Sequence, residues 1–161
     1  MITTKIQITP YLAEYLVAKM NNYSFEPFSI PDDQDLYHLI WKLMARRPSG
    51  LSPNDEGNIE IILPKRRLGK DPRYYNYLSP RSHQLIARNI KAMFDLDLHD
   101  AMTRNVRQGR PLRDVDVAYQ FMCDYGIESV TEDALVKNYY RWRENIRKRN
   151  TRKNKQMLKM N

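Results

Sequence analysis

The last 25 residues of this chain are its most strongly charged part, and nearly all of that charge has one sign. Between Lys137 and Asn161 there are ten lysines and arginines and one acid, Glu144, a net charge of +9. The whole chain carries +8, so the other 136 residues sum to −1. Lysine and arginine neutralise phosphates, and an excess of this kind predicts a polyanionic partner. We expect that partner to be nucleic acid, DNA rather than RNA.

These cations lie on a predicted helix, from Glu132 to about Arg149, and on the segment that follows it. Apolar residues recur every three or four positions, so one face should pack on the helix before it, from about Pro111 to Tyr125. The facing residues are expected to be Leu135, Tyr139, Trp142 and Ile146 on the later helix and Val115, Ala118, Phe121, Met122 and Tyr125 on the earlier one. The predicted nucleic-acid-binding residues are Lys137, Tyr140, Arg141, Arg143, Arg147, Lys148, Arg149, Arg152 and Lys153.

A solvated helix face is the simplest alternative for these charges, since most charged residues lie on the surface. Helices made only for solubility commonly mix both signs, because opposite charges four residues apart stabilise a helix and like charges destabilise it. The near absence of acids therefore favours a counter-charged partner. Contacts of this kind give affinity for phosphates without reading base sequence.

A second candidate basic patch lies in PKRRLGKDPRYYNY, where cations are interleaved with tyrosines. Its cations are Lys65, Arg66, Arg67, Lys70 and Arg73. Tyr74, Tyr75 and Tyr77 would offer rings on which the bases of a single strand can stack. The alternative is a basic loop whose tyrosines fold back onto the core.

Residue patterns typical of catalysis or metal binding are missing. No histidine pair, cysteine–histidine array or phosphate-binding GxxxxGK motif occurs in the sequence. Asp55, Glu56 and Glu60 with Lys65 are reminiscent of a metal-dependent nuclease, but Lys65 lies five residues after Glu60 instead of the two that share a strand face. We expect a non-enzymatic protein without cofactor or metal, and a nuclease stays open as an alternative.

The chain should fold as an α+β protein that is predominantly helical, with about five helices. Alternating apolar residues predict strands near Ile6 and Ile61, and a two-stranded sheet is marginal in water, so a third strand or covering helices are expected. Proline after a capping residue predicts helix starts at Pro10 and Pro80. The loop YSFEPFSIP should lay its apolar residues over the core. The predicted domains are an α+β core (1–108), a helix-turn-helix-like pair (109–150) and a basic disordered tail (151–161).

Composition indicates a globular protein. With 42% hydrophobic and 11% aromatic residues, a chain of 161 residues can bury a core. No apolar run approaches the roughly 20 residues that span a bilayer, and the first residues, MITTKIQITP, lack the order of a signal peptide. We expect a cytoplasmic protein with no membrane partner. Its single cysteine, Cys123, falls on a predicted helix and is expected to be a buried thiol.

The segment DVDVAYQFMCDYGIESVTEDALVKNYYRWRENIRKR resembles the helix-turn-helix of bacterial and phage regulators. It departs from that pattern because Ala118 and Gly126 are eight residues apart instead of four, and because Glu132 and Asp133 open the second helix, where a recognition helix approaches bases. With YNYLSPRS and FMCDYGIESVTEDALVKNYYRWR, the whole sequence also resembles small uncharacterised proteins of phages and mobile elements. That resemblance implies an accessory role in regulation, replication or recombination.

An interaction or assembly module is the alternative from another functional class. In that case the long helix after Ser79 would form a homo-oligomer, and the basic tail would keep the assembly soluble. Salt distinguishes the two, because phosphate contacts weaken steeply as salt rises while an apolar interface does not.

Overall fold

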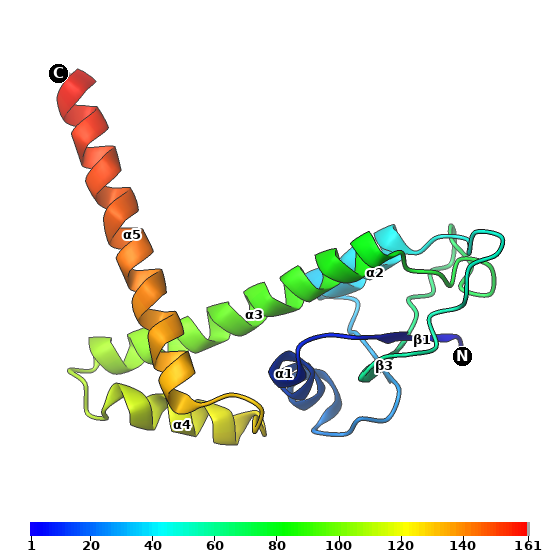
Figure 1. Cartoon of the computed structure of the whole chain (residues 1–161), viewed down its shortest axis with the longest axis horizontal. Coiled ribbons are helices and arrows are strands. Elements are labelled where there is room, and N and C mark those ends of the chain that lie inside the picture. Colours follow the sequence, from blue (N-terminus) through cyan, green and yellow to red (C-terminus); the bar gives the residue numbers. More distant parts are fainter. Residues whose placement is uncertain (161) are drawn as a thin grey trace. The chain divides into compact units, whose positions relative to one another are not determined.

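The computed structural model describes residues 1–160, which form five helices and a three-stranded sheet (Figure 1). Helices account for most of these residues, so the predicted α+β, predominantly helical fold is confirmed. In chain order the elements are β1 (Thr3–Ile6), α1 (Pro10–Asn21), β2 (Phe28–Ser29), α2 (Asp35–Leu43), β3 (Ile59–Ile62), α3 (Pro80–Arg107), α4 (Asp114–Asp124) and α5 (Glu132–Met160).

The chain divides into two compact units, and α3 runs through both. The first unit comprises Met1–Asp95 and Tyr125–Ser129, and the second comprises Leu96–Asp124 and the chain from Val130 onward. The boundary predicted from the sequence is residue 108, whereas the division falls inside α3. The last turns of α3 belong with the helical pair because the side chain of His99 contacts α5.

The sheet lies in the first unit and has the strand order β1-β3-β2. β1 runs antiparallel to β3, with Ile6 opposite Ile59. Ile6, Ile59 and Ile61 are buried, as their alternation predicts. The third strand, β2, pairs parallel to β3 through Phe28 and lies in the loop YSFEPFSIP. Phe28 is buried, as expected for that loop, but Phe25 is 56% exposed.

Two helices of the first unit begin at the prolines that predict them. Pro10 is the first residue of α1, where its missing amide hydrogen costs no helical hydrogen bond. Pro80 is the first residue of α3, and the Ser79 hydroxyl accepts a hydrogen bond from the Ser82 amide at 3.1 Å. The apolar faces of these two helices complete the core of the first unit. The largest fully buried side chains of this core include Tyr15, Phe94, Ile6, Leu16, Leu36, Ile40, Met44, Ile61, Leu78, Ile86 and Ile90.

In the second unit α4 and α5 pack on each other, largely through the predicted faces. The buried residues of those faces are Leu135, Tyr139, Ala118, Phe121 and Met122. Trp142 and Ile146 are only half-buried, and Trp142 stacks on His99 of α3. Two further predicted members lie elsewhere. Val115 is 40% exposed, because the inward stripe of α4 passes through Val117 instead. Tyr125 belongs to the first unit, where its ring centre is 5.0 Å from that of Tyr15.

The prediction that Cys123 is buried is wrong, because its thiol lies on the exposed face of α4. The buried residues of α4 are Val117, Ala118, Phe121 and Met122. At 100° per residue, Cys123 points almost opposite to the centre of that stripe. The cysteine is on a helix, as predicted, but on the other face of it.

Candidate nucleic-acid interface

α5 is longer than the sequence predicts. It continues to Met160 through residues for which a disordered tail is predicted; Asn161, the last residue of that tail, lies outside the described residues. Neither glycine nor proline follows Gly126, and lysine, arginine, glutamine, methionine and leucine all favour helix. Figure 1 shows α5 extending well past α4, and every residue from Arg147 to Met160 is exposed. This distal part, Arg147–Met160, is therefore a helix held by its own backbone hydrogen bonds.

The base of α5 is held within the second unit by one buried histidine of α3. The His99 ring stacks on Trp142, with the centroids 4.4 Å apart and the planes 21° from parallel. His99 Nε2 is also 2.7 Å from the side-chain oxygen of Asn138. Stacking and the hydrogen bond together fix the rotation of α5 about its own axis, and so decide which side chains face solvent.

Tyr140 makes a second contact at the base of α5. Its hydroxyl donates a short hydrogen bond to the Asp114 carboxylate at the start of α4, and this bond raises the pKa of Tyr140. Arg110 lies 3.9 Å from the same carboxylate. The sequence-based expectation for Tyr140 is a contact with a sugar or base. In the structure its hydroxyl links α5 to α4, while the residue as a whole is still 45% exposed.

Six cations share one side of α5 and form what we call the basic stripe. They follow one another at intervals of four, seven, four, three and four residues, and helical geometry places them within about 60° of each other. Over these residues a helix rises about 33 Å. The basic stripe consists of Lys137, Arg141, Lys148, Arg152, Lys155 and Lys159.

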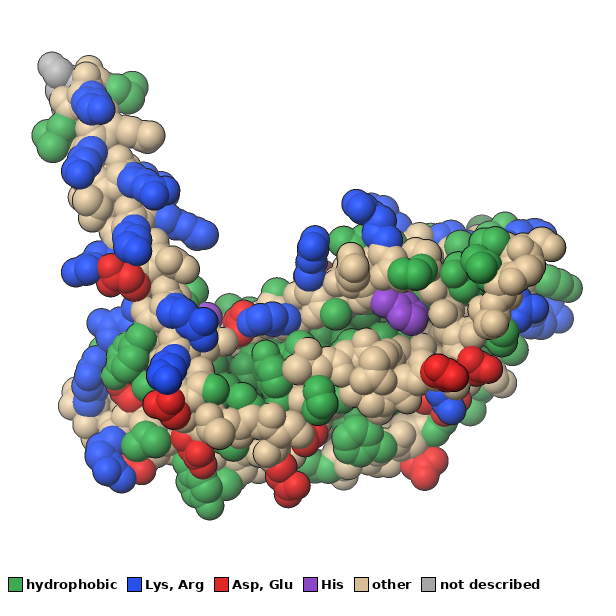
Figure 2. Space-filling model, viewed as in Figure 1, with side chains coloured by type: hydrophobic (Ala, Val, Ile, Leu, Met, Phe, Trp, Pro, Cys, Tyr) green, Lys and Arg blue, Asp and Glu red, His purple; other side chains and the backbone are tan. Residues whose placement is uncertain are grey.

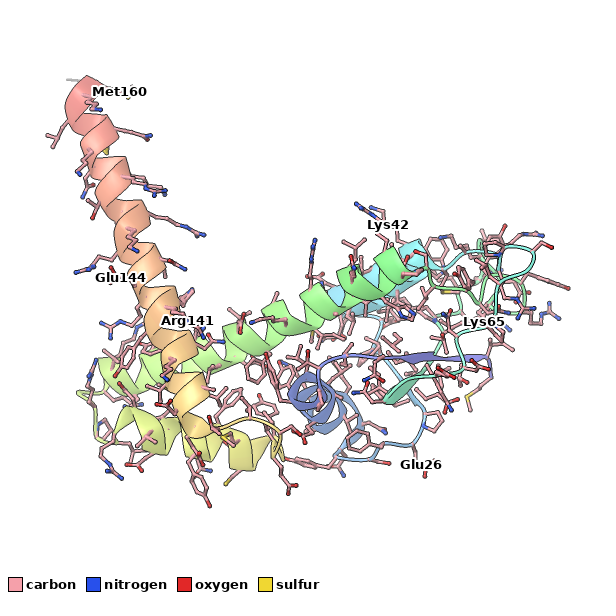
Figure 3. The ribbon with its side chains drawn as sticks, viewed as in Figure 1. Glu26, Lys42, Lys65, Arg141, Glu144 and Met160 are labelled. Carbon is pink, nitrogen blue, oxygen red and sulfur yellow. The ribbon has the colours of Figure 1, made fainter. Side chains whose placement is uncertain are left out.

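Lys155 and Lys159 are not among the predicted site residues, which end at Lys153 because the helix is expected to end near Arg149. The signal that identifies them is the same spacing of three and four residues, continued without a helix breaker. On the face shown in Figure 2, Lys and Arg side chains follow α5 along its length. Figure 3 shows Arg141 and Glu144 in the half nearer α4 and Met160 at the far end.

Cations near the base of α5 have partners on the same helix. Lys137 Nζ lies 3.0 Å from the Asp133 carboxylate, and Arg141 Nε lies 3.4 Å from the Lys137 carbonyl oxygen. The Arg143 guanidinium lies 5.6 Å from the centre of the Tyr139 ring. These contacts are exposed and weak, so they orient the side chains without removing them from solvent.

The distal part has one acid nearby, and one arginine already uses it. Arg147 Nη2 lies 2.7 Å from Glu144 Oε1, and this hydrogen bond, with the nearby charge of Lys148, holds the pKa of Glu144 below its usual value. Beyond it lie six cations that form no ion pair or hydrogen bond with another side chain of residues 1–160. They are Lys148, Arg149, Arg152, Lys153, Lys155 and Lys159.

The start of α5 differs from that of a recognition helix. Seven residues separate Asp124 from Glu132, whereas a helix-turn-helix has three or four. Glu132 and Asp133 occupy the first turn of α5, where they favour the positive end of the helix dipole but would oppose phosphates. The available cations are therefore on the middle and end of the helix.

The second basic patch is largely occupied by contacts within the first unit. The Arg66 guanidinium lies 4.1 Å from the centre of the Trp41 ring and donates a hydrogen bond to His38 Nδ1 at 2.6 Å. Lys70 Nζ donates hydrogen bonds to the carbonyl oxygens of Trp41 and Lys42, at 3.1 and 2.6 Å. Lys70 thus binds the negative end of the α2 dipole.

Arg73, in the same patch, is paired with Asp71 at 2.8 Å, and this contact lowers the pKa of Asp71. Its guanidinium also lies 5.7 Å from the centre of the Tyr74 ring. Lys65 and Arg67 are exposed and form no ion pair, hydrogen bond or ring contact among residues 1–160, although the charge of Lys65 also helps to lower the pKa of Asp71. Two of the five cations expected in this patch are thus free.

The acids suggested for a nuclease are not gathered into a metal site. Asp55 and Glu56 are exposed in the turn before β3, and Glu60 on β3 accepts a hydrogen bond of 2.6 Å from the Thr3 hydroxyl. Residues 1–160 hold no group of three or more His, Cys, Asp and Glu side chains that could bind a metal ion.

Within the described residues, no helix has both the length and the apolar character needed to cross a lipid bilayer. No family model, no curated protein and no solved structure matches this chain.

Proposed function

We propose that this protein binds nucleic acid, DNA in preference to RNA, through the basic stripe of α5. The observation that carries this proposal is the uncompensated charge of the distal part of that helix. Its only neighbouring acid, Glu144, is paired with Arg147, and the cations beyond it lack an acidic partner among residues 1–160.

Self-repulsion within α5 supports the need for a counter-charge. Lys148 with Arg152, and Lys155 with Lys159, are like-charged pairs four residues apart, a spacing that destabilises a helix. The distal part buries no apolar surface that would offset this cost. A row of phosphates would neutralise both members of each pair.

The dimensions of α5 fit duplex DNA. A helix with its side chains is about 10–12 Å wide, and the major groove of B-DNA is about 12 Å wide. The basic stripe, about 33 Å long, is close to one turn of the duplex, about 34–36 Å. One row of phosphates would meet the stripe, while Arg149 and Lys153, which lie to one side of it, would reach others. Such contacts bind the backbone and do not read sequence.

The biological setting is also a proposal. The resemblance to phage and mobile-element proteins favours a cytoplasmic accessory in regulation, replication or recombination of such an element. Non-specific backbone binding suits an accessory that positions other components along DNA.

Fluorescence anisotropy over a salt series tests the proposal. Duplex DNA, single-stranded DNA and RNA of one length are titrated with the full chain between about 50 and 200 mM salt. If all six stripe cations contact phosphates, the logarithm of affinity should fall with the logarithm of salt with a slope of about −5. Replacing Lys148, Arg152 and Lys155 by Gln should reduce the steepness by about 3.

A matched control removes the same charge from the first unit by replacing Lys42, Arg81 and Arg88, which lie outside α5, with Gln. This control should keep the slope near that of the unchanged protein. Equal losses in the two triple variants would show that only net charge matters. Absence of binding to all three nucleic acids at low salt would overturn the proposal and favour an assembly module.

A further inference from the structure

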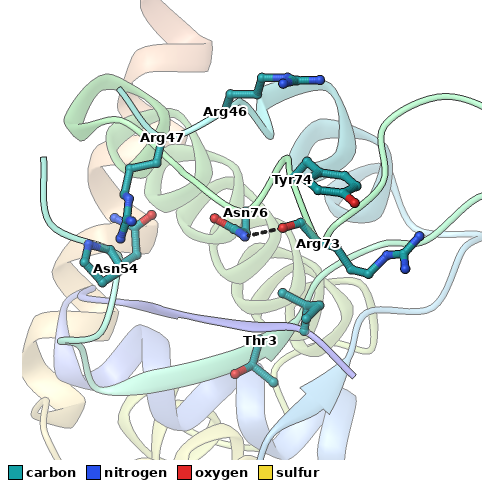
Figure 4. A pocket seen from close by; sticks show the side chains of 9 residues that line it. Thr3, Arg46, Arg47, Asn54, Arg73, Tyr74 and Asn76 are labelled. Carbon is teal, nitrogen blue, oxygen red and sulfur yellow. Dashed lines mark hydrogen bonds between the residues drawn. The ribbon is translucent and has the colours of Figure 1, made fainter. Parts of the chain in front are cut away.

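The first unit contains an open hollow of about 550 Å³ that is lined by three arginines. Arg46 and Arg47 follow α2, and Arg73 comes from the loop before α3. Tyr74, Asn54 and Asn76 line it as well. Figure 4 shows Arg47 and Asn54 on one side, Tyr74 and Arg73 on the other, Asn76 between them and Thr3 below. No local sequence pattern links Arg46 and Arg47 to Arg73, because the Ala45–Tyr77 pairing that brings their segments together joins residues far apart in the chain.

Hydrogen bonds hold the segments around this hollow together. Ala45 and Tyr77 exchange two backbone hydrogen bonds of 3.0 Å, which places the residues after α2 beside the loop before α3. The Asn54 side chain accepts a hydrogen bond from the Leu78 amide at 2.7 Å and donates one to its carbonyl at 3.1 Å. Asn76 donates to the Arg73 carbonyl at 3.1 Å. The hollow is therefore formed before any ligand arrives.

The charge of the hollow is positive. Arg47 is exposed and forms no ion pair or hydrogen bond among residues 1–160. Arg46 lies over the Tyr75 ring at 5.1 Å, a contact that leaves its charge uncompensated. Arg73 is paired with Asp71, which does not line the hollow. Guanidinium groups bind phosphate oxygens through two parallel hydrogen bonds, so the hollow is suited to a phosphate.

An aromatic ring lies beside these arginines. Tyr74 is 59% exposed and lines the hollow. A base can stack on an exposed tyrosine, and this stacking tolerates any base. The volume falls within the range of small-molecule sites, about 300–1,000 Å³.

We propose that this hollow binds one nucleotide unit, with its phosphate on Arg47, the arginine of the hollow that has no partner among residues 1–160, and its base against Tyr74. The ligand is either a free nucleotide or the phosphorylated end of a single strand, because both present the same chemistry. This site does not depend on the function of α5, since its residues belong to the other unit.

Isothermal titration calorimetry on the full chain tests the site. Deoxyadenosine monophosphate should bind at least tenfold more tightly than deoxyadenosine or inorganic phosphate, because only the nucleotide offers both phosphate and base. Arg47→Gln should weaken this binding about tenfold, as expected for loss of a hydrogen bond to a charged group. Tyr74→Ala should weaken it about fivefold, and Tyr74→Phe should restore it.

Arg67→Gln is the matched control, because Arg67 is an exposed arginine of the same loop that does not line the hollow. It should change binding less than twofold. The site should also persist when Lys148, Arg152 and Lys155 are replaced by Gln, which separates it from α5.

Competition by an oligonucleotide with a phosphorylated end, but not by one without it, would identify a strand end as the ligand. No competition by either oligonucleotide would identify the free nucleotide. Equal effects of Arg47→Gln and Arg67→Gln, or equal binding of nucleotide and inorganic phosphate, would overturn the proposal.

Discussion

Two stretches of nine residues in this protein are similarly rich in cations, yet the structure uses their charges differently. Residues 65–73 contain five lysines and arginines, and residues 147–155 contain six. In the first stretch, Arg66, Lys70 and Arg73 are bound to a tryptophan ring, to the last carbonyls of α2 and to Asp71. In the second, only Arg147 has a charged partner among residues 1–160.

This difference indicates that a candidate interface is marked by cations without partners in the protein, more than by the number of cations in a stretch. The cations of the loop stabilise the fold, because α2 supplies them with an aromatic ring and free carbonyl groups. The cations of α5 after Arg147 have no comparable neighbours among residues 1–160. The stability that they could contribute is realised only with a partner. Removing Arg66, Lys70 or Arg73 should therefore affect folding, and removing distal α5 cations should affect binding.

Charge reversal has the largest expected effect of the changes considered. It tests whether the charges of the two stretches are used differently. Replacing Lys148, Arg152 and Lys155 by Glu should lower the affinity for duplex DNA more than 100-fold at low salt, because three attractive contacts become repulsive. Replacing Lys65 and Arg67 by Glu should lower it less than fivefold. Anisotropy at one fixed salt concentration measures both. Comparable losses per charge in the two variants would mean that the loop belongs to the same interface.

Gly69→Ala should be the most destabilising change in the basic loop. Gly69 has a φ of +104°, and a Cβ there would lie 2.7 Å from Trp41 Cζ2, against the ring that holds Arg66. We expect a loss of about 1–3 kcal/mol in the free energy of unfolding, measured by urea denaturation.

Gly50→Ala is the control for Gly69→Ala, because Gly50 has a φ of +83° but an added Cβ would meet no atom within 4 Å. It should lose about 1 kcal/mol or less, from backbone strain alone. DNA affinity per folded molecule should stay unchanged in both variants. If the two variants were equally stable, close packing of the loop on Trp41 would not be what anchors its cations.

Lys70→Met should cost about 1 kcal/mol of unfolding free energy. It removes the hydrogen bonds to the Trp41 and Lys42 carbonyls and the positive charge at the end of α2, while keeping a long apolar chain. Lys65→Met, in the same loop, should leave stability unchanged because Lys65 has no such contact among residues 1–160. Thermal unfolding followed by circular dichroism distinguishes the two variants. A Lys70→Met protein as stable as the unchanged protein would contradict the structural role given to this lysine.

Local signals explain which parts of the fold are predictable. Proline after a capping serine or threonine indicates the starts of α1 and α3, and period-two alternation indicates β1 and β3. The strand β2 has two residues, Phe28 and Ser29, and forms because β3, about 30 residues later, offers a parallel edge. Such a short strand has no period of its own, so the sequence can indicate a third strand only as a requirement of the other two.

The candidate site, like the fold, is predictable only where the signal is local in the sequence. Helical spacing alone puts Lys137, Arg141 and Lys148 on one side of α5. Continuation of the stripe to Lys159 escapes prediction when residues 151–161 are expected to form a disordered tail, whereas the residues from Thr151 to Met160 favour or tolerate helix. The partners of Lys70 lie 28 and 29 residues before it, and no local pattern reveals them.

Asp71→Asn should have the smallest effect. It tests the comparison by releasing a loop cation from its partner instead of removing one. Asp71 holds the Arg73 guanidinium through an ion pair and accepts a hydrogen bond from the Arg73 amide. An asparagine keeps an oxygen for the amide but loses the charge, so Arg73 becomes available as an unpaired cation. If the loop contributes little to binding because its cations are occupied, freeing one should raise affinity for single-stranded DNA about twofold to fivefold and steepen the salt slope by less than 1. Asp55→Asn removes the same charge from an exposed acid without a cationic partner among residues 1–160 and serves as the control. An equal gain in both variants would reflect net charge alone, and occupancy of Arg73 would then not explain why the two basic stretches differ.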